Sequence, residues 1–178
     1  MRAAGPVHRM MSDVHEAVAP DLLRYFLRRV SSPEDAADLL AESFLVAWRR
    51  RSRLPFDATE QRMWMFGIAN NVLRNGKRAV RRQAALAAEL RETLTVTTGE
   101  TSAAADVREL VRAALTTLPA NQAELVRLIH WDGFTVIESA RILSVRESTA
   151  RGRYQRARLA LRESLADSVA ERVTPQAG

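Results

Sequence analysis

The chain has 178 residues, of which 47% are hydrophobic and 27% charged, a composition typical of globular proteins. This length allows one compact domain or two small ones. The absence of cysteine excludes disulfides, thiolate metal sites and a cysteine nucleophile. No apolar run reaches the ~20 residues of a membrane span, and no apolar signal stretch opens the chain. We therefore expect a cytoplasmic protein without a membrane partner.

Basic residues outnumber acidic ones by 27 to 21, which gives a formal net charge of +6 at pH 7. Only Lys77 is a lysine, and every other basic residue is arginine. Arginine suits phosphate groups and guanine edges, but a bias in coding composition is the simpler explanation of the excess. The positions of the charges are therefore more informative than their number.

Helical periodicity dominates the first half of the chain, where it predicts helices over residues 21–29, 33–51 and 60–82. Ser32 and Pro33 suit the cap and the first position of the second helix. The residues expected in the core of these helices are Leu22, Leu23, Phe26, Val30, Ala36, Leu40, Phe44, Ala47, Trp48, Trp64, Ile68, Val72 and Leu73.

Six of the ten residues from Thr93 to Ser102 are Thr or Ser, which is typical of a linker. Helices are expected again over 107–116, 119–131 and from Thr135 onwards. The predicted fold class is all-α, with two small helical domains joined by a flexible linker. The predicted divisions are an N-terminal extension (1–19), a first domain (20–84), the linker (85–106), a second domain (107–168) and a tail (169–178).

Two helices joined by a short break at 144–146, the second of them rich in arginine, indicate a helix-turn-helix in the second domain. Thr135 and Glu138 match a capping box at the start of its first helix. From Arg146 to Arg162 there are six arginines and one acid. Such charge favours contact with a phosphate backbone, although a solvated basic helix is the alternative. The predicted buried residues are Ile137, Ala140, Leu143, Ala150, Tyr154, Ala157 and Leu161.

Residues near the start of a recognition helix reach base edges, and later ones meet phosphates. The candidates for base contact are Ser148, Thr149, Arg151, Gly152 and Gln155. The candidates for phosphate contact are Arg146, Arg153, Arg156 and Arg158. Gly152 either permits close approach to DNA or is an incidental glycine.

Charge is separated by helix in the first domain. Asp35, Asp38 and Glu42 recur at i, i+3 and i+7 and form an acidic stripe, which indicates a basic protein partner or a solvated face. The third predicted helix combines positive charge, aromatics and amides, as binding of single-stranded nucleic acid requires. These candidates are Trp64, Phe66, Asn70, Asn71, Arg74, Asn75, Lys77 and Arg78, although Trp64 and Phe66 also suit the core.

Three motifs in register resemble extracytoplasmic-function (ECF) sigma factors of the sigma-70 family. They are the core-polymerase-binding segment at 35–48, the −10 promoter-melting helix at 64–71 with Asn75 and Arg78, and the −35-binding domain at 118–119, 132–135 and 149–158. Together they span about residues 20–83 and 107–166. Departures from the family pattern are Ser144 in place of a common glycine, Ala150 in place of a β-branched residue, and Asn75 in place of a frequent aspartate.

The resemblance implies a factor that binds core RNA polymerase and directs recognition and melting of promoters. Asp35, Asp38 and Glu42 would contact the clamp helices of the largest polymerase subunit, and the flap of the second-largest subunit is a further partner. Asn71, with Asn70, Arg74 and Asn75, would read the −10 strand, and loop 54–61 would help to capture an extruded base. Many family members are held inactive by an anti-sigma factor, which suggests such a partner here. The resemblance implies no cofactor, metal or catalytic residue.

The alternative is a helix-turn-helix repressor or activator that never docks on polymerase, and the acidic stripe disfavours it. An enzyme is a third class. His8, His15 and His130 match no metal-ligand spacing, and the chain has no nucleophile–base motif or phosphate-binding glycine loop. The sequence therefore favours a non-catalytic transcription factor.

Overall fold

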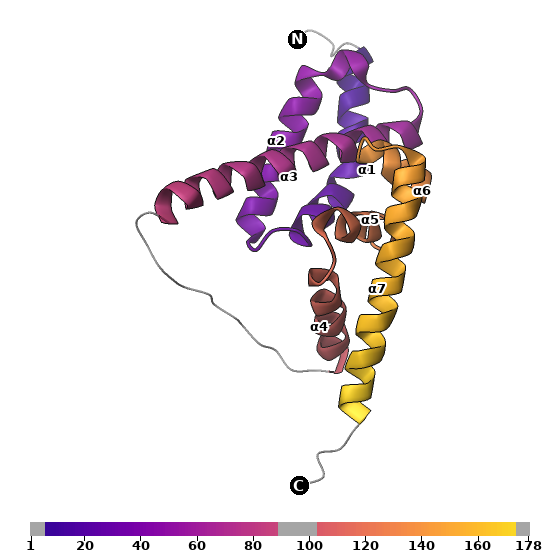
Figure 1. Cartoon of the computed structure of the whole chain (residues 1–178). Coiled ribbons are helices and arrows are strands. Elements are labelled where there is room, and N and C mark those ends of the chain that lie inside the picture. The colour runs from indigo at the N-terminus through magenta and orange to yellow at the C-terminus, as the bar shows by residue number, and fades with distance from the viewer. Residues whose placement is uncertain (1–5, 89–102, 174–178) are drawn as a thin grey trace. The chain divides into compact units, whose positions relative to one another are not determined.

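The computed structural model of the chain describes residues 6–88 and 103–173, and all regular secondary structure in these ranges is helical. The chain forms two compact units, the first centred on α1–α3 and the second on α4–α7 (Figure 1). The all-α fold with two small helical domains was predicted correctly. Each unit is described by itself below.

The first unit contains α1 (Pro6–Leu27), α2 (Pro33–Arg49), a 3-10 turn η1 (Arg51–Arg53) and α3 (Ala58–Ala88). The second unit contains α4 (Ala103–Thr116), α5 (Ala120–His130), α6 (Val136–Ile142) and α7 (Glu147–Val173). Both ends of the predicted linker, 85–88 and 103–106, are therefore helical, while its residues 89–102 lie outside the described residues. The last helix likewise continues beyond its predicted end near Ala166.

The first helix begins fifteen residues before its predicted start at Asp21, so much of the predicted N-terminal extension belongs to α1. Pro20 lies inside this helix, where proline normally interrupts the backbone hydrogen bonds. Met11, Val14 and Val18 are nonetheless buried. They lie on the same helical face as Leu22, at spacings of three and four residues. Burial of this stripe offsets the local cost of the proline.

Aromatic side chains dominate the core of the first unit. Tyr25, Phe26 and Phe66 are fully buried, and the rings of Tyr25 and Phe66 meet edge to face at 5.4 Å between centroids. Phe66 is therefore a core residue and not a surface on which a base could stack. Trp48 was predicted in the core but is 40% exposed. It lies near the end of α2, where the His8 ring meets it edge to face at 5.3 Å between centroids.

Short side-chain contacts set the ends of the helices in the first unit. The backbone N–H of Asp35 donates to the Ser32 hydroxyl at 3.0 Å, which confirms the predicted cap of α2. Before α3, Asp57 Oδ1 accepts from the backbone N–H of Glu60 at 2.9 Å. The side-chain amide of Gln61 donates to the Pro55 carbonyl at 2.9 Å. The loop that leads into α3 is therefore tied to the first turn of that helix.

In the second unit, α4 and α5 pack along α7 (Figure 1). One buried cluster consists of Leu115, Leu118, Ala123, Val126 and Ala157, and Leu125, Leu128 and Phe134 are buried as well. Ile137 was predicted in the core but is 42% exposed, whereas Ser139 and Ala140 on the same helix are buried. Two residues correspond to about 200° around a helix, so Ile137 lies on the side opposite Ser139.

Candidate nucleic-acid interface

The helix-turn-helix in the second unit begins with the predicted capping box. The backbone N–H of Thr135 donates to Glu138 Oε2 at 2.7 Å, and the backbone N–H of Glu138 donates to the Thr135 hydroxyl at 3.2 Å. Each side chain thus satisfies a backbone group that the helix leaves unpaired. This reciprocal pair fixes where α6 begins.

The turn between α6 and α7 contains Ser144 with a φ of 54°, in the left-handed region. Its N–H donates to the Arg141 carbonyl at 3.1 Å, and the N–H of Val145 donates to the Ala140 carbonyl at 2.9 Å. A side chain costs energy in this conformation, and glycine avoids that cost. The turn therefore forms although serine stands where the family commonly has glycine, and Ser144 adopts a conformation that favours glycine.

The recognition helix α7 buries a narrow side made of small residues. Ala150 and Ala157 are fully buried, and Tyr154 lies half-buried between them. The Tyr154 hydroxyl is 2.9 Å from Nε2 of His130 on α5, while the Arg158 guanidinium lies over the Tyr154 ring at 5.8 Å. These contacts orient the helix and turn its arginine-rich side outward.

The predicted DNA-contacting residues of α7 lie on its accessible sides. Those that are exposed are Arg146, Ser148, Arg151, Gln155, Arg156 and Arg158, while Thr149, Gly152 and Arg153 are half-buried. Arg151 Nε donates to Glu147 Oε1 at 2.9 Å, and a second nitrogen of the same guanidinium also contacts that oxygen. The one acid of this segment thus neutralises the arginine predicted to read a base.

The acidic stripe of α2 is exposed at all three positions, Asp35, Asp38 and Glu42. The buried side of the same helix consists of Ala36, Ser43 and Ala47. The stripe therefore faces away from the core, as predicted. Three carboxylates on an accessible face offer an electrostatic complement to a basic protein surface.

The amides of α3 separate into two groups. Asn71 and Asn75 are exposed, as is Arg74 between them, but Asn70 is only 3% exposed. One residue turns the helix by about 100°, so Asn70 faces the core and Asn71 the surface. The prediction that Asn70 contacts a DNA strand does not agree with this burial. Lys77 and Arg78 lie on the same helix, but their side chains are outside the described residues.

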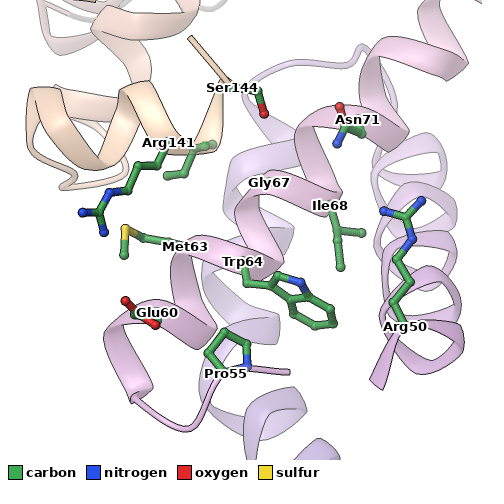
Figure 2. Close-up of a pocket in the computed structure, with 11 residues that line it drawn as sticks. Arg50, Pro55, Glu60, Met63, Trp64, Gly67, Ile68, Asn71, Arg141 and Ser144 are labelled. Carbon is green, nitrogen blue, oxygen red and sulfur yellow. The ribbon is translucent and has the colours of Figure 1, made fainter. Parts of the chain in front are cut away.

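Trp64 is half-buried on α3, with Ile68 and Asn71 one and two turns further along the same side. Figure 2 shows these three side chains in a groove with Pro55 of the preceding loop beside Trp64. Next to Pro55 in the chain, Phe56 is 92% exposed. Phe56 lies in loop 54–61, which the resemblance implies in base capture, and it is a large apolar residue directly after a proline between two helices.

The described residues contain no group of three or more His, Cys, Asp or Glu side chains that could hold a metal ion. Within the same part of the chain, no helix is both long and apolar enough to cross a membrane.

Two family models match this chain. The model of sigma-70 region 2 matches residues 14–84, and that of sigma-70 region 4 matches residues 108–161. The chain belongs to the sigma-70 family. The first match begins six residues before the predicted start of the first domain and includes part of α1, while the second lies within the predicted second domain.

This sigma factor is similar to the ECF RNA polymerase sigma factor SigL of Mycobacterium tuberculosis. The two are 29% identical over 164 residues, which cover 92% of this chain and 91% of SigL. This likeness over nearly the whole of both chains agrees with the two family models and places the protein in the ECF branch.

Solved structures of sigma factors share the fold. The sigma factor RpoE of Bartonella quintana, in complex with the anti-sigma factor NepR, gives a TM-score of 0.70 at 23% identity, covering 89% of this chain and 98% of RpoE. CnrH, in complex with the cytosolic domain of CnrY, gives a TM-score of 0.56 at 23% identity, covering 91% of this chain and 88% of CnrH. At these identities the likeness extends to the fold.

Proposed function

We propose that this ECF sigma factor binds core RNA polymerase, directs it to promoters through −10 and −35 elements, and promotes melting of the −10 region. The observation that carries the proposal is the separation of exposed charge, with acids on α2 and basic and amide side chains on α3 and α7. The factor supplies binding and strand separation, while the chemistry belongs to the polymerase.

The second unit binds the −35 duplex through α7. A major groove admits one helix, and an arginine that donates two hydrogen bonds to guanine is the most common specific contact. Arg151 takes this role with Ser148, Thr149, Gly152 and Gln155 near it, because all lie in the first turns of α7. The contacts to phosphates come from Arg146, Arg153, Arg156 and Arg158, and they make binding dependent on salt.

The first unit holds the melted −10 strand along α3. Asn71 and Asn75 offer amides to base edges, and Arg74 between them meets the backbone. Trp64 and the exposed ring of Phe56 provide apolar surface for a base taken out of the stack, a step that costs a few kcal/mol. Lys77 and Arg78 follow on the same helix and extend its positive charge.

The acidic stripe on α2 binds the clamp helices of the largest polymerase subunit, and the second unit meets the flap of the second-largest subunit. The exposed acidic face disfavours a repressor that binds DNA alone, because DNA repels it. RpoE, which shares this fold, binds the anti-sigma factor NepR. An anti-sigma factor that covers these surfaces is therefore part of the proposal.

Run-off transcription with core polymerase and a promoter library tests this function. We expect transcripts from a subset of promoters that share two elements. Asp38→Arg should weaken the affinity for core polymerase, measured by capture of the core enzyme, about tenfold or more. The reason is that like charges facing each other across an interface cost several kcal/mol. Asp13→Arg, the same reversal at an exposed acid of α1, should leave it unchanged.

The duplex affinity of the second unit distinguishes a docking defect from misfolding. Asp38→Arg should retain normal affinity for −35 duplex DNA. Unchanged capture of core polymerase by Asp38→Arg would overturn the docking role of the stripe. An absence of promoter-specific transcripts with the wild-type chain would overturn the proposed function.

A further inference from the structure

A small pocket lies between α1 and α2 in the first unit, and the side chains that line it have no part in the contacts proposed above. Its volume of about 220 Å³ is below the range of about 300–1,000 Å³ that is typical of sites for organic ligands. A pocket of this size suits an ion. The residues that line it are His8, Met11, Ser12, His15, Phe44 and Trp48.

Three of these side chains follow one another along one side of α1. Met11 lies three residues after His8 and four residues before His15. Residues at these spacings are neighbours on a helix, with about 5–6 Å between their Cβ atoms. The two imidazoles alone are two turns apart and match no metal-ligand spacing. The thioether between them completes a series of nitrogen, sulfur and nitrogen donors that line one pocket.

Aromatic rings of α2 lie against both imidazoles. The His8 ring meets Trp48 at 5.3 Å between centroids, and the His15 ring lies against Phe44 at 4.4 Å. Both histidines are exposed, whereas Met11 is only 5% exposed. The thioether therefore lies deepest in the pocket, and the imidazoles lie on its solvent side.

This set of donors is chemically soft. Imidazole binds several transition metals, whereas a thioether favours Cu(I). Among the described residues that line the pocket there is no carboxylate, the ligand that suits Mg²⁺, Ca²⁺ and Mn²⁺. The Arg51 guanidinium lies over the Trp48 ring at 5.0 Å, and its positive charge repels a divalent cation more strongly than a monovalent one. The pocket therefore favours a soft monovalent ion.

We propose that His8, Met11 and His15 bind one soft monovalent cation of the class of Cu(I), through one ring nitrogen of each histidine and the thioether sulfur. The inference goes beyond the proposed function, because the site shares no residue with the DNA or polymerase contacts. All three ligands come from α1, so the ion holds two turns of that helix together. The chain has no cysteine, and therefore no thiolate competes for the ion.

Titration of the full chain with Ag⁺ tests the site, because Ag⁺ is a soft monovalent ion that needs no reductant. By isothermal titration calorimetry in a chloride-free buffer, we expect one Ag⁺ to bind per chain and Zn²⁺ to bind at least about tenfold more weakly. The NMR signals of the His8 and His15 rings should shift on binding. The signal of His130, whose Nε2 lies 2.9 Å from the Tyr154 hydroxyl, should not.

Met11→Leu removes the thioether but conserves volume, a kind of change that cores tolerate well. It should weaken Ag⁺ binding about tenfold or more, which is at least about 1.4 kcal/mol. Met10→Leu is the matched control, at a half-buried methionine that does not line the pocket. His8→Gln and His15→Gln change exposed side chains and leave the core intact. Each should weaken Ag⁺ binding as well, while His130→Gln should not.

Equal affinities of Met11→Leu and Met10→Leu for Ag⁺ would overturn the inference, and so would a wild-type chain that shows no saturable binding. Tighter binding of Zn²⁺ than of Ag⁺ would contradict the soft class of the site. Shifts of all three histidine signals together would mean adventitious binding to imidazoles. Since no measurement uses DNA or polymerase, the site can fail while the proposed function stands.

Discussion

The two units present their candidate DNA contacts on surfaces of opposite shape. In the first unit, Asn71 and Asn75 line a cavity between two packed helices. In the second, Arg151 projects from a long helix on which, among the described side chains, Ala150 and Ala157 alone are fully buried. A cavity suits a base that has left the stack, and a projecting helix suits a major groove. Under the proposed function, the cavity of the first unit would meet a single strand and the projecting helix of the second a duplex.

The two units also differ in the residues that fill their cores. Tyr25, Phe26 and Phe66 are fully buried in the first core, whereas the largest fully buried side chains of the second are Leu125 and Leu128, and its Phe134 is buried at 4% exposed. Aromatic side chains bury more area per residue, so these three rings account for a large share of the apolar area buried in the first unit. A surface that encloses a base needs fixed walls, while a helix that enters a groove needs a fixed axis and exposed side chains.

The largest expected effect comes from the aromatic core of the first unit. Phe66→Ala should destabilise this unit by about 3–5 kcal/mol, because it leaves a cavity where a fully buried ring was. Phe56→Ala, at a ring that is 92% exposed, should change stability by less than about 0.5 kcal/mol. Denaturant titration of the full chain by circular dichroism measures both. Equal effects of the two changes would contradict the packing described here.

The next effect distinguishes base contact from phosphate contact on α7. Arg151→Ala should cost about 1–3 kcal/mol of binding free energy on the preferred −35 duplex and relax specificity at one base pair. Arg158→Ala should weaken binding to every duplex alike and reduce the salt slope by about 1. Equilibrium binding to a duplex library at several salt concentrations measures both. A uniform loss for Arg151→Ala would reassign Arg151 to a phosphate.

A smaller effect is expected in the turn of the helix-turn-helix. Ser144→Gly should stabilise the helix-turn-helix by about 0.5–1 kcal/mol, because glycine adopts the left-handed conformation without the cost of a side chain. This figure already allows for the conformational entropy that glycine adds to the unfolded chain. Ser144→Ala keeps a Cβ atom and should give no such gain. Thermal unfolding of the two variants decides the point, and a gain with alanine would show that backbone strain is not the cause.

The smallest change in stability concerns the acid beside Arg151. Glu147→Gln should lower stability by at most about 0.5 kcal/mol, since the pair is an exposed i,i+4 contact. It should raise affinity for any duplex severalfold, because a negative charge near phosphates is removed and Arg151 is released. Fluorescence anisotropy with specific and scrambled duplexes measures this. A loss of specific affinity alone would mean that Glu147 holds Arg151 in its binding geometry.

Local signals made much of the fold predictable. The Ser32 cap, the Thr135–Glu138 box and the break before α7 depend on neighbours in sequence, and all three formed as expected. The start of α1 was missed because Pro20 is a local signal against a helix, while burial of Met11 and its neighbours depends on packing against other helices. Tertiary contacts outweighed the local preference there.

The sequence identified the helices of the candidate site, but not which side chains on each helix are exposed. Composition identified α3 as a mixed basic and amide helix. Asn70 and Asn71 nevertheless differ in burial, because the way α3 packs on its neighbours decides which of two adjacent residues faces the core. The cavity that joins Glu42 to Asn71 depends on how α2 and α3 pack, and no spacing along the chain encodes it.

The most direct test of the division between the units is a crossed binding measurement. Holoenzymes that contain Asn71→Ala or Arg151→Ala are titrated in parallel with a −10 single strand and with a −35 duplex. We expect Asn71→Ala to lose affinity for the single strand alone, and Arg151→Ala to lose affinity for the duplex alone. If either variant weakened both ligands equally, the two units would not read two forms of DNA.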